Sequence, residues 1–387
     1  MASSIAWRAL SETSHSARVL DPMIGSGTTA MVARSLGHRA VGFDTDPLAV
    51  LLATTWCSDV QEQRVRDAAE RVLRNAVRWH RAIPLAEAYP AGADDETRRF
   101  TRYWFDGTNR RQLAALAQAI RFQRDEGVRT VLWCAFSRLI ITKQASASRA
   151  LDLAHSRPHR VDDREPIRPM EHFLRAVDAV LKASPFKCVR NGPKAQIRAG
   201  DARRLPAKRA SFDFVITSPP YFNGIDYLRG HKFSLIWMGH LLDDLRGIRA
   251  TNIGTEVAGS AADLSPALAA AARRLGQIDQ LPARSQGQLA RFVTDMHAAL
   301  GEIARVLKPG GRAVLVVGDS FQRGVFVRNS RAVTHLAKHR GLEFVRRQQR
   351  AIPDTRRYLP PPSARGSGRG LRKRLRAEVV LTFAKGD

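Results

Sequence analysis

The 387-residue chain carries 63 Lys and Arg against 36 Asp and Glu, and its net charge of +27 argues against an ordinary cytosolic enzyme, which would lie far nearer neutrality. Such a surplus points to a polyanionic partner, and the dominance of arginine favours bidentate contacts to phosphates and guanine edges. Neither a run of 18 apolar residues nor a basic start followed by a long apolar run occurs, so we expect no membrane span, no export and a cytoplasmic location.

A strand, a glycine-rich turn and a helix are predicted near the amino terminus. The apolar residues 17–20 lead into Asp21, and helical spacing of hydrophobic residues begins at Thr28. Between them, Gly25 and Gly27 can adopt positive φ and let a ligand approach the backbone, while the start of the helix offers unpaired N–H groups. The carboxylate at the end of the strand suits a cationic ligand.

The second predicted strand, residues 39–43, ends at Asp44. An acid about 20 residues after such a turn binds ribose hydroxyls in Rossmann-like sites, and Asp46 could share that role. A single G-x-G lacks the third glycine of a dinucleotide site, and the chain has no G-x-x-x-x-G-K-[ST] phosphate loop. S-adenosylmethionine fits these features better, with its adenosine at Asp44, its amino-acid tail on the glycine turn and its sulfonium near Asp21.

Residues 61–190 are predicted to be mostly helical, and at about 130 residues they have the size of a domain. Within them, His155 and His159 lie in a loop without carboxylate or cysteine partners, so we predict no metal site. The chain has three cysteines without metal-like spacing, and their odd number argues against a disulfide framework. They are Cys57, Cys134 and Cys188.

A buried strand predicted at residues 211–216 runs into the loop Ser218-Pro219-Pro220-Tyr221. The two prolines fix φ and remove two N–H donors, so the loop is stiff and its carbonyls point in set directions. An exocyclic amino group has a delocalised lone pair and is a poor nucleophile. Hydrogen bonds from its two N–H groups to a hydroxyl oxygen and a backbone carbonyl can hold it pyramidal, and Tyr221 offers a π face on which a flipped base can stack.

The remaining predicted elements alternate between helix and strand. An insertion at residues 240–288 precedes a helix at residues 292–307, which ends at the K-P-G-G of residues 308–311. A buried strand follows at residues 312–319, and residues 377–385 form a final strand that we expect to be the antiparallel edge strand. This alternation predicts a doubly wound sheet with its ligand at the carboxyl ends of the strands.

The densest basic segment lies between residues 346 and 376 and includes a Pro- and Gly-rich loop. Such a loop could become ordered on a phosphate backbone. The predicted nucleic-acid contacts are Arg365, Arg369, Arg372 and Arg374.

Together, D-P-x-x-G-S-G-T-T, G-x-D-x-x-P, S-P-P-Y and the K-P-G-G strand entry resemble the motifs of amino-methylating DNA methyltransferases, which modify cytosine N4 or adenine N6 on the class I methyltransferase fold. The resemblance covers roughly residues 15–60 and 195–387. It implies that the cofactor is S-adenosylmethionine. The cofactor contacts that it implies are Asp21, Gly25, Gly27, Thr28, Asp44 and, on the adenine side, Asp201. The catalytic loop that it implies is Ser218, Pro219, Pro220 and Tyr221.

The same resemblance favours cytosine N4 as the target, because S-P-P-Y occurs more with cytosine N4 and D-P-P-Y more with adenine N6. Adenine N6, guanine N2 of a tRNA and a non-catalytic DNA-binding subunit stay open as alternatives. Methylation of cytosine C5 needs a cysteine nucleophile, usually after a proline, and no cysteine here follows a proline. The implied partner is double-stranded DNA, from which the target base is flipped out of the helix. A cognate restriction nuclease is a further candidate partner.

The expected architecture is therefore α/β: a Rossmann-like class I methyltransferase sheet, doubly wound with an antiparallel last strand, and a mostly helical insertion. We expect residues 1–60 to form the cofactor-binding half of the methyltransferase domain. Residues 61–190 form the helical insertion, which could recognise the target. Residues 191–387 form the catalytic half, with the insertion at 240–288 and the basic C-terminal loop.

Overall fold

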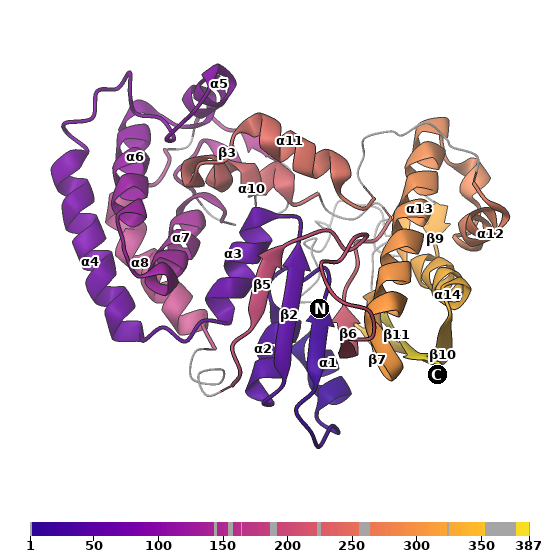
Figure 1. Ribbon diagram of the computed structural model, residues 1–387. Helices are drawn as coiled ribbons and strands as arrows, with labels where there is room; N and C mark the ends of the chain where they lie inside the picture. The colour runs from indigo at the N-terminus through magenta and orange to yellow at the C-terminus, as the bar shows by residue number, and fades with distance from the viewer. Residues whose placement is uncertain are drawn as a thin grey trace. The chain divides into compact units, whose positions relative to one another are not determined.

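The computed structural model describes residues 2–142, 145–153, 158–163, 165–185, 192–222, 226–254, 264–322, 325–352 and 377–386. The chain divides into two compact units (Figure 1). The sheet unit comprises Met1–Thr45, Gly192–Gly224 and Ala250–Asp387, and the helical unit comprises Asp46–Asn191 and Ile225–Arg249.

The sheet unit contains a seven-stranded sheet with the order β10-β11-β7-β6-β1-β2-β5. From β5 to β7 all neighbours are parallel, whereas β11 is antiparallel to both β7 and β10. This is the Rossmann-like α/β fold that the sequence predicts, with one antiparallel strand. The strands are β1 Arg18–Asp21, β2 Arg39–Asp44, β5 Gln196–Ala199, β6 Phe212–Thr217, β7 Leu307–Val317, β10 Leu342–Ala351 and β11 Ala377–Lys385.

The last strand is antiparallel as predicted, but the prediction that it forms the edge of the sheet was wrong. β11 lies between β7 and β10, and β10 is the edge strand. Burial explains the difference, because β10 has one buried residue at its start and is otherwise exposed or half-buried. Its sequence therefore lacks the apolar pattern by which a covered strand is recognised.

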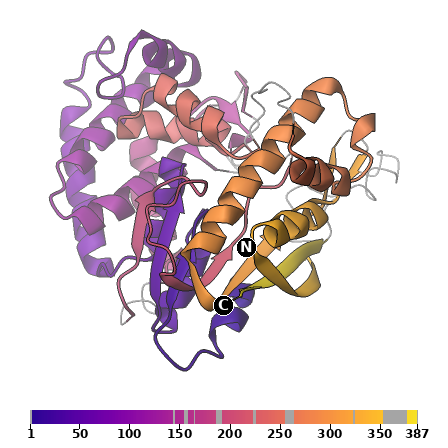
Figure 2. The same ribbon diagram turned by 45° about the vertical axis from the view of Figure 1, so that its right-hand side comes forward.

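The described residues of the sheet unit include the helices α1 Ser3–Leu10, α2 Thr28–Ser35, α12 Pro266–Arg274, α13 Ala283–Val306 and α14 Asn329–His339. α2 packs on β1 and β2, α13 on β7, and α14 on β10 and β11 (Figures 1 and 2). The core joins Leu315, Leu381 and Phe383 of the strands to Phe292 and Met296 of α13. Full burial of such a side chain stabilises the fold by about 1.5–3 kcal/mol. A short hairpin, β8 Ser320–Gln322 and β9 Val325–Val327, follows β7.

The helical unit contains α3 Pro47–Trp56, α4 Glu62–Trp79, α5 Asp95–Trp104, α6 Gly107–Arg121, α7 Glu126–Ile140, α8 Pro169–Ala183, α10 Leu228–Leu235 and most of α11 Leu242–Thr251. It also contains a two-residue ladder between β3 Ala150–Leu151 and β4 His159–Arg160. Four of its helices begin after an aspartate whose side chain accepts a backbone N–H of the first turn, which satisfies one of the N–H groups that a helix start leaves unpaired. These N-cap residues are Asp46, Asp94, Asp106 and Asp125.

Aromatic side chains form much of the core of the helical unit. The ring of Phe233 in α10 lies 4.9 Å from the rings of both Phe100 and Trp104, and Trp237 lies 5.5 Å from Phe105. Tyr103, in contrast, is 52% exposed. The second chain segment of the unit therefore supplies core residues to helices that come more than a hundred residues earlier in the sequence.

Cys57 and Cys134 are buried, as small core residues, and Cys188 lies outside the described residues. Burial raises the pKa of the Cys134 thiol to about 12. Among the described residues, no helix is long and apolar enough to cross a membrane.

Candidate active site at the carboxyl edge of the sheet

The predicted site residues follow the carboxyl ends of four neighbouring strands. Asp21 ends β1, Asp44 ends β2, Asp201 comes two residues after β5, and Ser218 comes directly after β6. These strands are adjacent and parallel. The sheet therefore brings the four residues to one edge, where open α/β sheets bind their ligands.

The glycine-rich turn after β1 is fixed to the end of β2. The backbone N–H of Gly25 donates to Asp44 Oδ2 at 2.9 Å, and the N–H of Ile24 donates to the carbonyl of Phe43 at 2.8 Å. Gly25 has a φ of 51° and Gly27, which precedes α2, has a φ of 83°. Since other residues adopt this left-handed region only at a cost, both positions require glycine.

Space at the turn is compatible with a bound ligand. A methyl group placed on Gly25 would meet no other atom within 4 Å, so neighbouring side chains do not fill the region in front of this residue. Positive φ, rather than crowding within the protein, is what makes glycine necessary here. The turn, the start of α2 at Thr28 and the Asp44 carboxylate together fit an adenosine carrying an amino-acid tail.

Asp21 is only 3% exposed and is hydrogen-bonded to this turn and to the start of α2. Its Oδ2 accepts the Thr29 hydroxyl at 2.7 Å, and its Oδ1 accepts the Met23 N–H at 3.2 Å. Burial raises the pKa of Asp21 above its ordinary value, although these two hydrogen bonds act in the opposite direction. The contacts make Asp21 a structural centre of the turn as well as a candidate partner for a cationic ligand.

Asp201 is held by an arginine that the sequence analysis did not single out. The Arg203 guanidinium donates to both Asp201 oxygens, from Nη2 at 2.6 Å and from Nε at 3.1 Å. Its other contacts are Asp295 Oδ1 of α13 at 2.7 Å and the carbonyl of Thr251 at 2.7 Å. Burial acts to raise the pKa of Asp201, but the hydrogen bonds from Arg203 outweigh it and hold this pKa below its ordinary value. Any contact from Asp201 to an adenine therefore uses a carboxylate that Arg203 orients.

We expect Arg203→Met to lower the free energy of unfolding by roughly 1 to 2 kcal/mol at pH 8, because two partly buried carboxylates lose the guanidinium that they share. Burial already raises the pKa of Asp295, and in the variant only the more distant Arg291 and the backbone N–H of residue 203 still act against the burial of these acids. Carboxyl pKa values raised in the folded state destabilise it above those values and cease to do so once both states are protonated. Urea unfolding should therefore show a smaller deficit at pH 4.5 than at pH 8. An equal deficit at both values would contradict the pairing.

The S-P-P-Y loop is attached to β7. The Ser218 hydroxyl donates to the carbonyl of Val316 at 3.0 Å. Because a hydroxyl has one proton, this bond leaves the lone pairs of Ser218 Oγ available to accept from a ligand. Pro219 is buried, and Pro220 and Tyr221 are half-buried.

Asn329, the first residue of α14, fixes the other end of this loop and was missed by the sequence analysis. It is fully buried. Its Oδ1 accepts the backbone N–H of Phe222 at 3.2 Å, while its Nδ2 donates to the carbonyl of Gly318 at 2.9 Å and to Ser320 Oγ at 3.1 Å. Ser320 Oγ in turn donates to the carbonyl of Phe222 at 3.2 Å. The only signal in the sequence is an asparagine at a helix start, which normally indicates a cap and nothing more.

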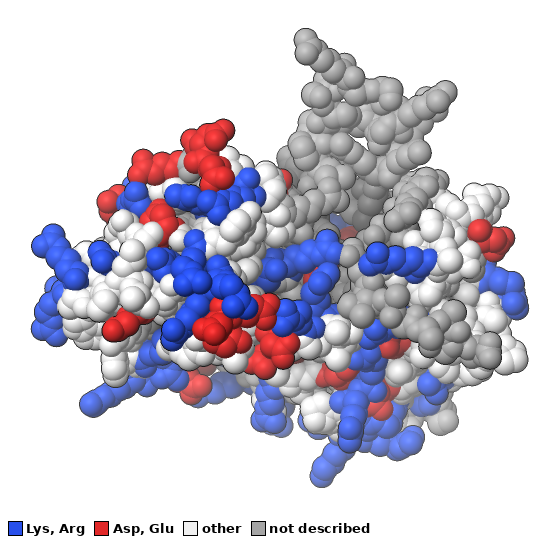
Figure 3. Space-filling model, turned by 90° about the horizontal axis from the view of Figure 1, so that it is seen from above, with Lys and Arg blue, Asp and Glu red and all other residues white. Residues whose placement is uncertain are grey.

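Asp46, which could share the ribose role with Asp44, contacts two residues of the helical unit. Its Oδ1 accepts the N–H of Leu48 at 2.9 Å, and its Oδ2 lies 2.6 Å from His231 Nδ1. The predicted nucleic-acid contacts Arg365, Arg369, Arg372 and Arg374 lie outside the described residues, as does His155. Lys and Arg side chains are spread over much of the face drawn in Figure 3, with Asp and Glu between them.

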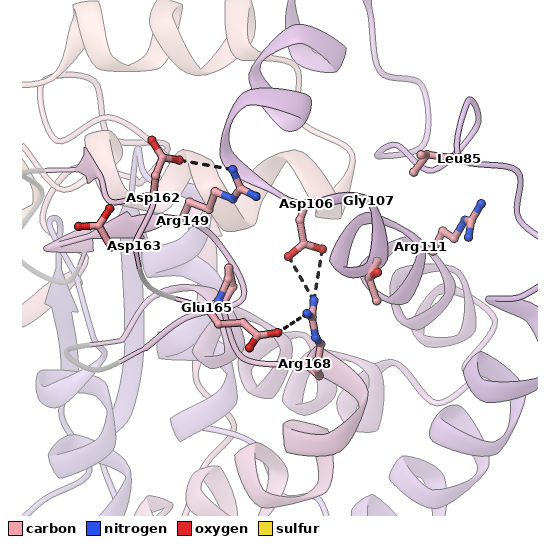
Figure 4. A pocket seen from close by; sticks show the side chains of 11 residues that line it. Leu85, Asp106, Gly107, Arg111, Arg149, Asp162, Asp163, Glu165 and Arg168 are labelled. Carbon is pink, nitrogen blue, oxygen red and sulfur yellow. Dashed lines mark hydrogen bonds and ion pairs between the residues drawn. The ribbon is translucent and has the colours of Figure 1, made fainter.

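A cavity of about 630 Å³ opens in the helical unit (Figure 4). Three arginines line it together with four carboxylates. Arg168 binds Asp106 at 3.2 Å and Glu165 at 2.6 Å, and Arg149 lies 3.4 Å from Asp162. Since these charges pair with one another, the cavity has none of the positive surplus that a polyanion would need.

No protein-family model matches the chain. In sequence, it is similar to the Type II methyltransferase M.MvaI of Kocuria varians, with 20% identity over 362 residues that cover 88% of this chain and 78% of that protein. It is also similar to the Type II methyltransferase M.BsoBI of Geobacillus stearothermophilus, with 21% identity over 261 residues that cover 62% of this chain and half of that protein.

Solved structures similar to the chain include a SAM-dependent methyltransferase from Methanosarcina mazei, with 10% identity, a TM-score of 0.35, and coverage of 98% of this chain and 97% of that one. A TehB-like SAM-dependent methyltransferase from Corynebacterium glutamicum aligns with 11% identity, a TM-score of 0.31, and coverage of 98% and 86%. By its strand order and its two loops the chain has the class I methyltransferase fold, and its sequence is similar to those of Type II DNA methyltransferases.

Proposed function

We propose that the protein transfers a methyl group from S-adenosylmethionine to an exocyclic amino group of a DNA base, with cytosine N4 as the favoured target. The observation that carries this proposal is the arrangement of Asp44, the glycine turn and the Ser218 hydroxyl on neighbouring strand ends. The net charge of +27 and the two curated relatives support DNA as the substrate.

When bound, S-adenosylmethionine supplies an electrophilic methyl group on a positively charged sulfur. The turn at Gly25 and the start of α2 provide room and N–H groups for its amino-acid part. Asp44 would hold the ribose hydroxyls while it also fixes the Gly25 N–H. The same carboxylate would thus shape the turn and bind the cofactor.

Ser218 and the loop carbonyls would bind the amino group of the target base. With its proton given to Val316, Ser218 Oγ can accept one amino N–H, and a carbonyl of the stiff loop can accept the other. Tyr221 would stack on the flipped base. S-adenosylmethionine would supply the methyl group to the nitrogen held by these groups, S-adenosylhomocysteine would leave, and the nitrogen would release one proton to solvent. No covalent intermediate with the protein is required, and proximity supplies much of the rate.

Adenine N6 is the second candidate, since the same loop chemistry serves either amino group. The test is to digest DNA and, separately, RNA from cells that express the protein and to identify the modified nucleoside by mass spectrometry, with a Ser218→Ala strain as the control. N4-methylcytosine supports the proposal, and N6-methyladenine moves the target to adenine. A methylated guanine in RNA, or no new nucleoside at all, would refute it. Long-read sequencing would give the recognition sequence, against which a paired restriction nuclease can be sought.

A smaller effect is expected from Asn329→Ala, which we predict lowers kcat about tenfold while the Kd for S-adenosylmethionine stays the same. The variant frees Phe222 and Gly318, so the loop that carries Tyr221 loses its fixed position, and misplacement of a reacting group is costly. Asn329→Asp keeps an acceptor for the Phe222 N–H but loses both donors. Its kcat should lie between those of the wild type and Asn329→Ala. A folded Asn329→Ala protein with full kcat would show that the residue only stabilises the fold.

A further inference from the structure

The edge strand β10 is level with the catalytic loop across the sheet. Following the register from strand to strand, Thr217 of β6 is opposite Leu315 of β7, Leu315 is opposite Leu381 of β11, and Leu381 is opposite Arg347 of β10. Arg347 therefore lies in the same row as the residue that precedes Ser218. Three strand spacings of about 4.8 Å separate the two, which is about 14 Å.

β10 also runs parallel to β6 and β7, because β11 is antiparallel to its neighbours on both sides. Its carboxyl end points toward the same sheet edge as the predicted cofactor and catalytic residues. The last pairing between β11 and β7 is at Val379, opposite Gln349. Beyond it, Arg350 and Ala351 pair only with β11, so the two-stranded ribbon extends past the rest of the sheet.

Three arginines lie along this strand. From Glu343 to Ala351 every residue is exposed or half-buried, although α14 contacts the strand. Arg346 and Arg347 are exposed neighbours on opposite faces of the strand. Arg350 binds Glu378 at 2.6 Å and is already neutralised.

We propose that the segment Arg346–Arg350, the β10 edge, contacts the phosphate backbone of the DNA duplex whose target base reaches Ser218. The inference depends on the proposed function and specifies a surface for it. At about 3.4 Å per nucleotide, 14 Å corresponds to about four nucleotides from the flipped base, within one site. Arg346 and Arg347 are exposed on opposite faces of the edge strand, so they can meet phosphates that pass along this edge of the sheet.

Charge on an edge strand has another established use, which is to prevent pairing with the edge of a second copy. The two roles differ in what they predict. A phosphate contact releases counterions and so contributes to the salt dependence of DNA binding, whereas a charge that only prevents pairing affects the oligomeric state.

The test is the double variant Arg346→Gln, Arg347→Gln in the full chain. Its matched control is Arg39→Gln, Arg312→Gln, which removes two exposed arginines near the amino-terminal edge of the same sheet and changes the net charge equally. Fluorescence anisotropy would measure DNA affinity as a function of salt concentration. One duplex would contain the sequence that the protein modifies, and the other would have a random sequence. Relative to the control, we expect the slope of log K against log salt to flatten by up to about 1.8 for two contacts, and the affinity at 0.1 M salt to fall by up to about 60-fold on both duplexes.

Base preference and the rate at saturating DNA should be unchanged, because the β10 edge lies outside the catalytic loop. Slopes and affinities equal to those of the control would overturn the inference. So would an unchanged slope together with a new dimer in light scattering, which would assign the arginines to preventing self-association. If the wild-type protein modifies no DNA and shows no salt-dependent binding, the proposed function itself fails; if it modifies DNA but the two variants behave alike, only the β10 edge is wrong.

Discussion

Ser218→Ala should lower the rate of methyl transfer by roughly 10²-fold while the affinity for S-adenosylmethionine stays close to that of the wild type. The hydroxyl oxygen would accept an amino N–H of the base, and loss of one preorganised hydrogen bond at a reacting group has an effect of about this size. The hydroxyl contacts the Val316 carbonyl, on the β7 side of the loop, and not the glycine turn. Single-turnover measurements at saturating DNA and cofactor would give the rate, and calorimetry would give the cofactor affinity.

Ser211→Ala is the matched control for this experiment. Ser211 directly precedes β6, the strand that Ser218 follows, and its hydroxyl donates to the carbonyl of Lys208. It should leave both quantities unchanged. Full activity in Ser218→Ala would show that another group accepts the amino N–H.

Asp44→Ala should weaken S-adenosylmethionine binding by about 1.5 to 3 kcal/mol, or roughly 10- to 150-fold in Kd, the loss expected for a charge-assisted hydrogen bond. Two effects combine here. The variant loses the acid proposed to hold the ribose, and the Gly25 N–H loses its acceptor. Calorimetry on a variant with a normal melting temperature is the measurement.

Asp44→Asn separates these two effects. The amide oxygen can still accept the Gly25 N–H and so preserve the turn, but the negative charge is lost. An affinity near that of the wild type would mean that Asp44 acts mainly by shaping the turn. An unchanged affinity in Asp44→Ala would remove Asp44 from the site altogether.

The parts of the fold that sequence predicted are those in which chemistry and local structure coincide. The turn at Gly25 needs positive φ, and the prolines at 219 and 220 restrict the backbone of their own loop. Both features can therefore be predicted from a few neighbouring residues. The buried strands β6 and β7 carry the continuous apolar runs of a covered parallel sheet. The alternation of strands and helices along the chain predicts the doubly wound sheet.

Other features depend on contacts between distant parts of the chain. β10 lacks an apolar pattern because its residues after Leu342 are exposed or half-buried, and Asn329 shows its role only when α14 packs beside the loop at Phe222. Arg203 is likewise one arginine among many until Asp201 and Asp295 are seen on either side of it. Hydrogen-bond and ion-pair partners that are far apart in the sequence cannot be predicted from local spacing.

The composition of the helical unit from two chain segments limits how it can be handled as a module. A fragment cut at residues 46 and 191 would retain Phe100, Trp104 and Phe105 but would lose Phe233 and Trp237, which pack against them. Grafting the unit into another protein would therefore need two insertions and four junctions. One junction directly follows the segment that ends at Asp44 and Thr45, and another comes three residues after Tyr221. Exchange of this unit between proteins, by recombination or by design, would require cuts beside Asp44 and beside the loop of Ser218 and Tyr221, on which the proposed chemistry depends.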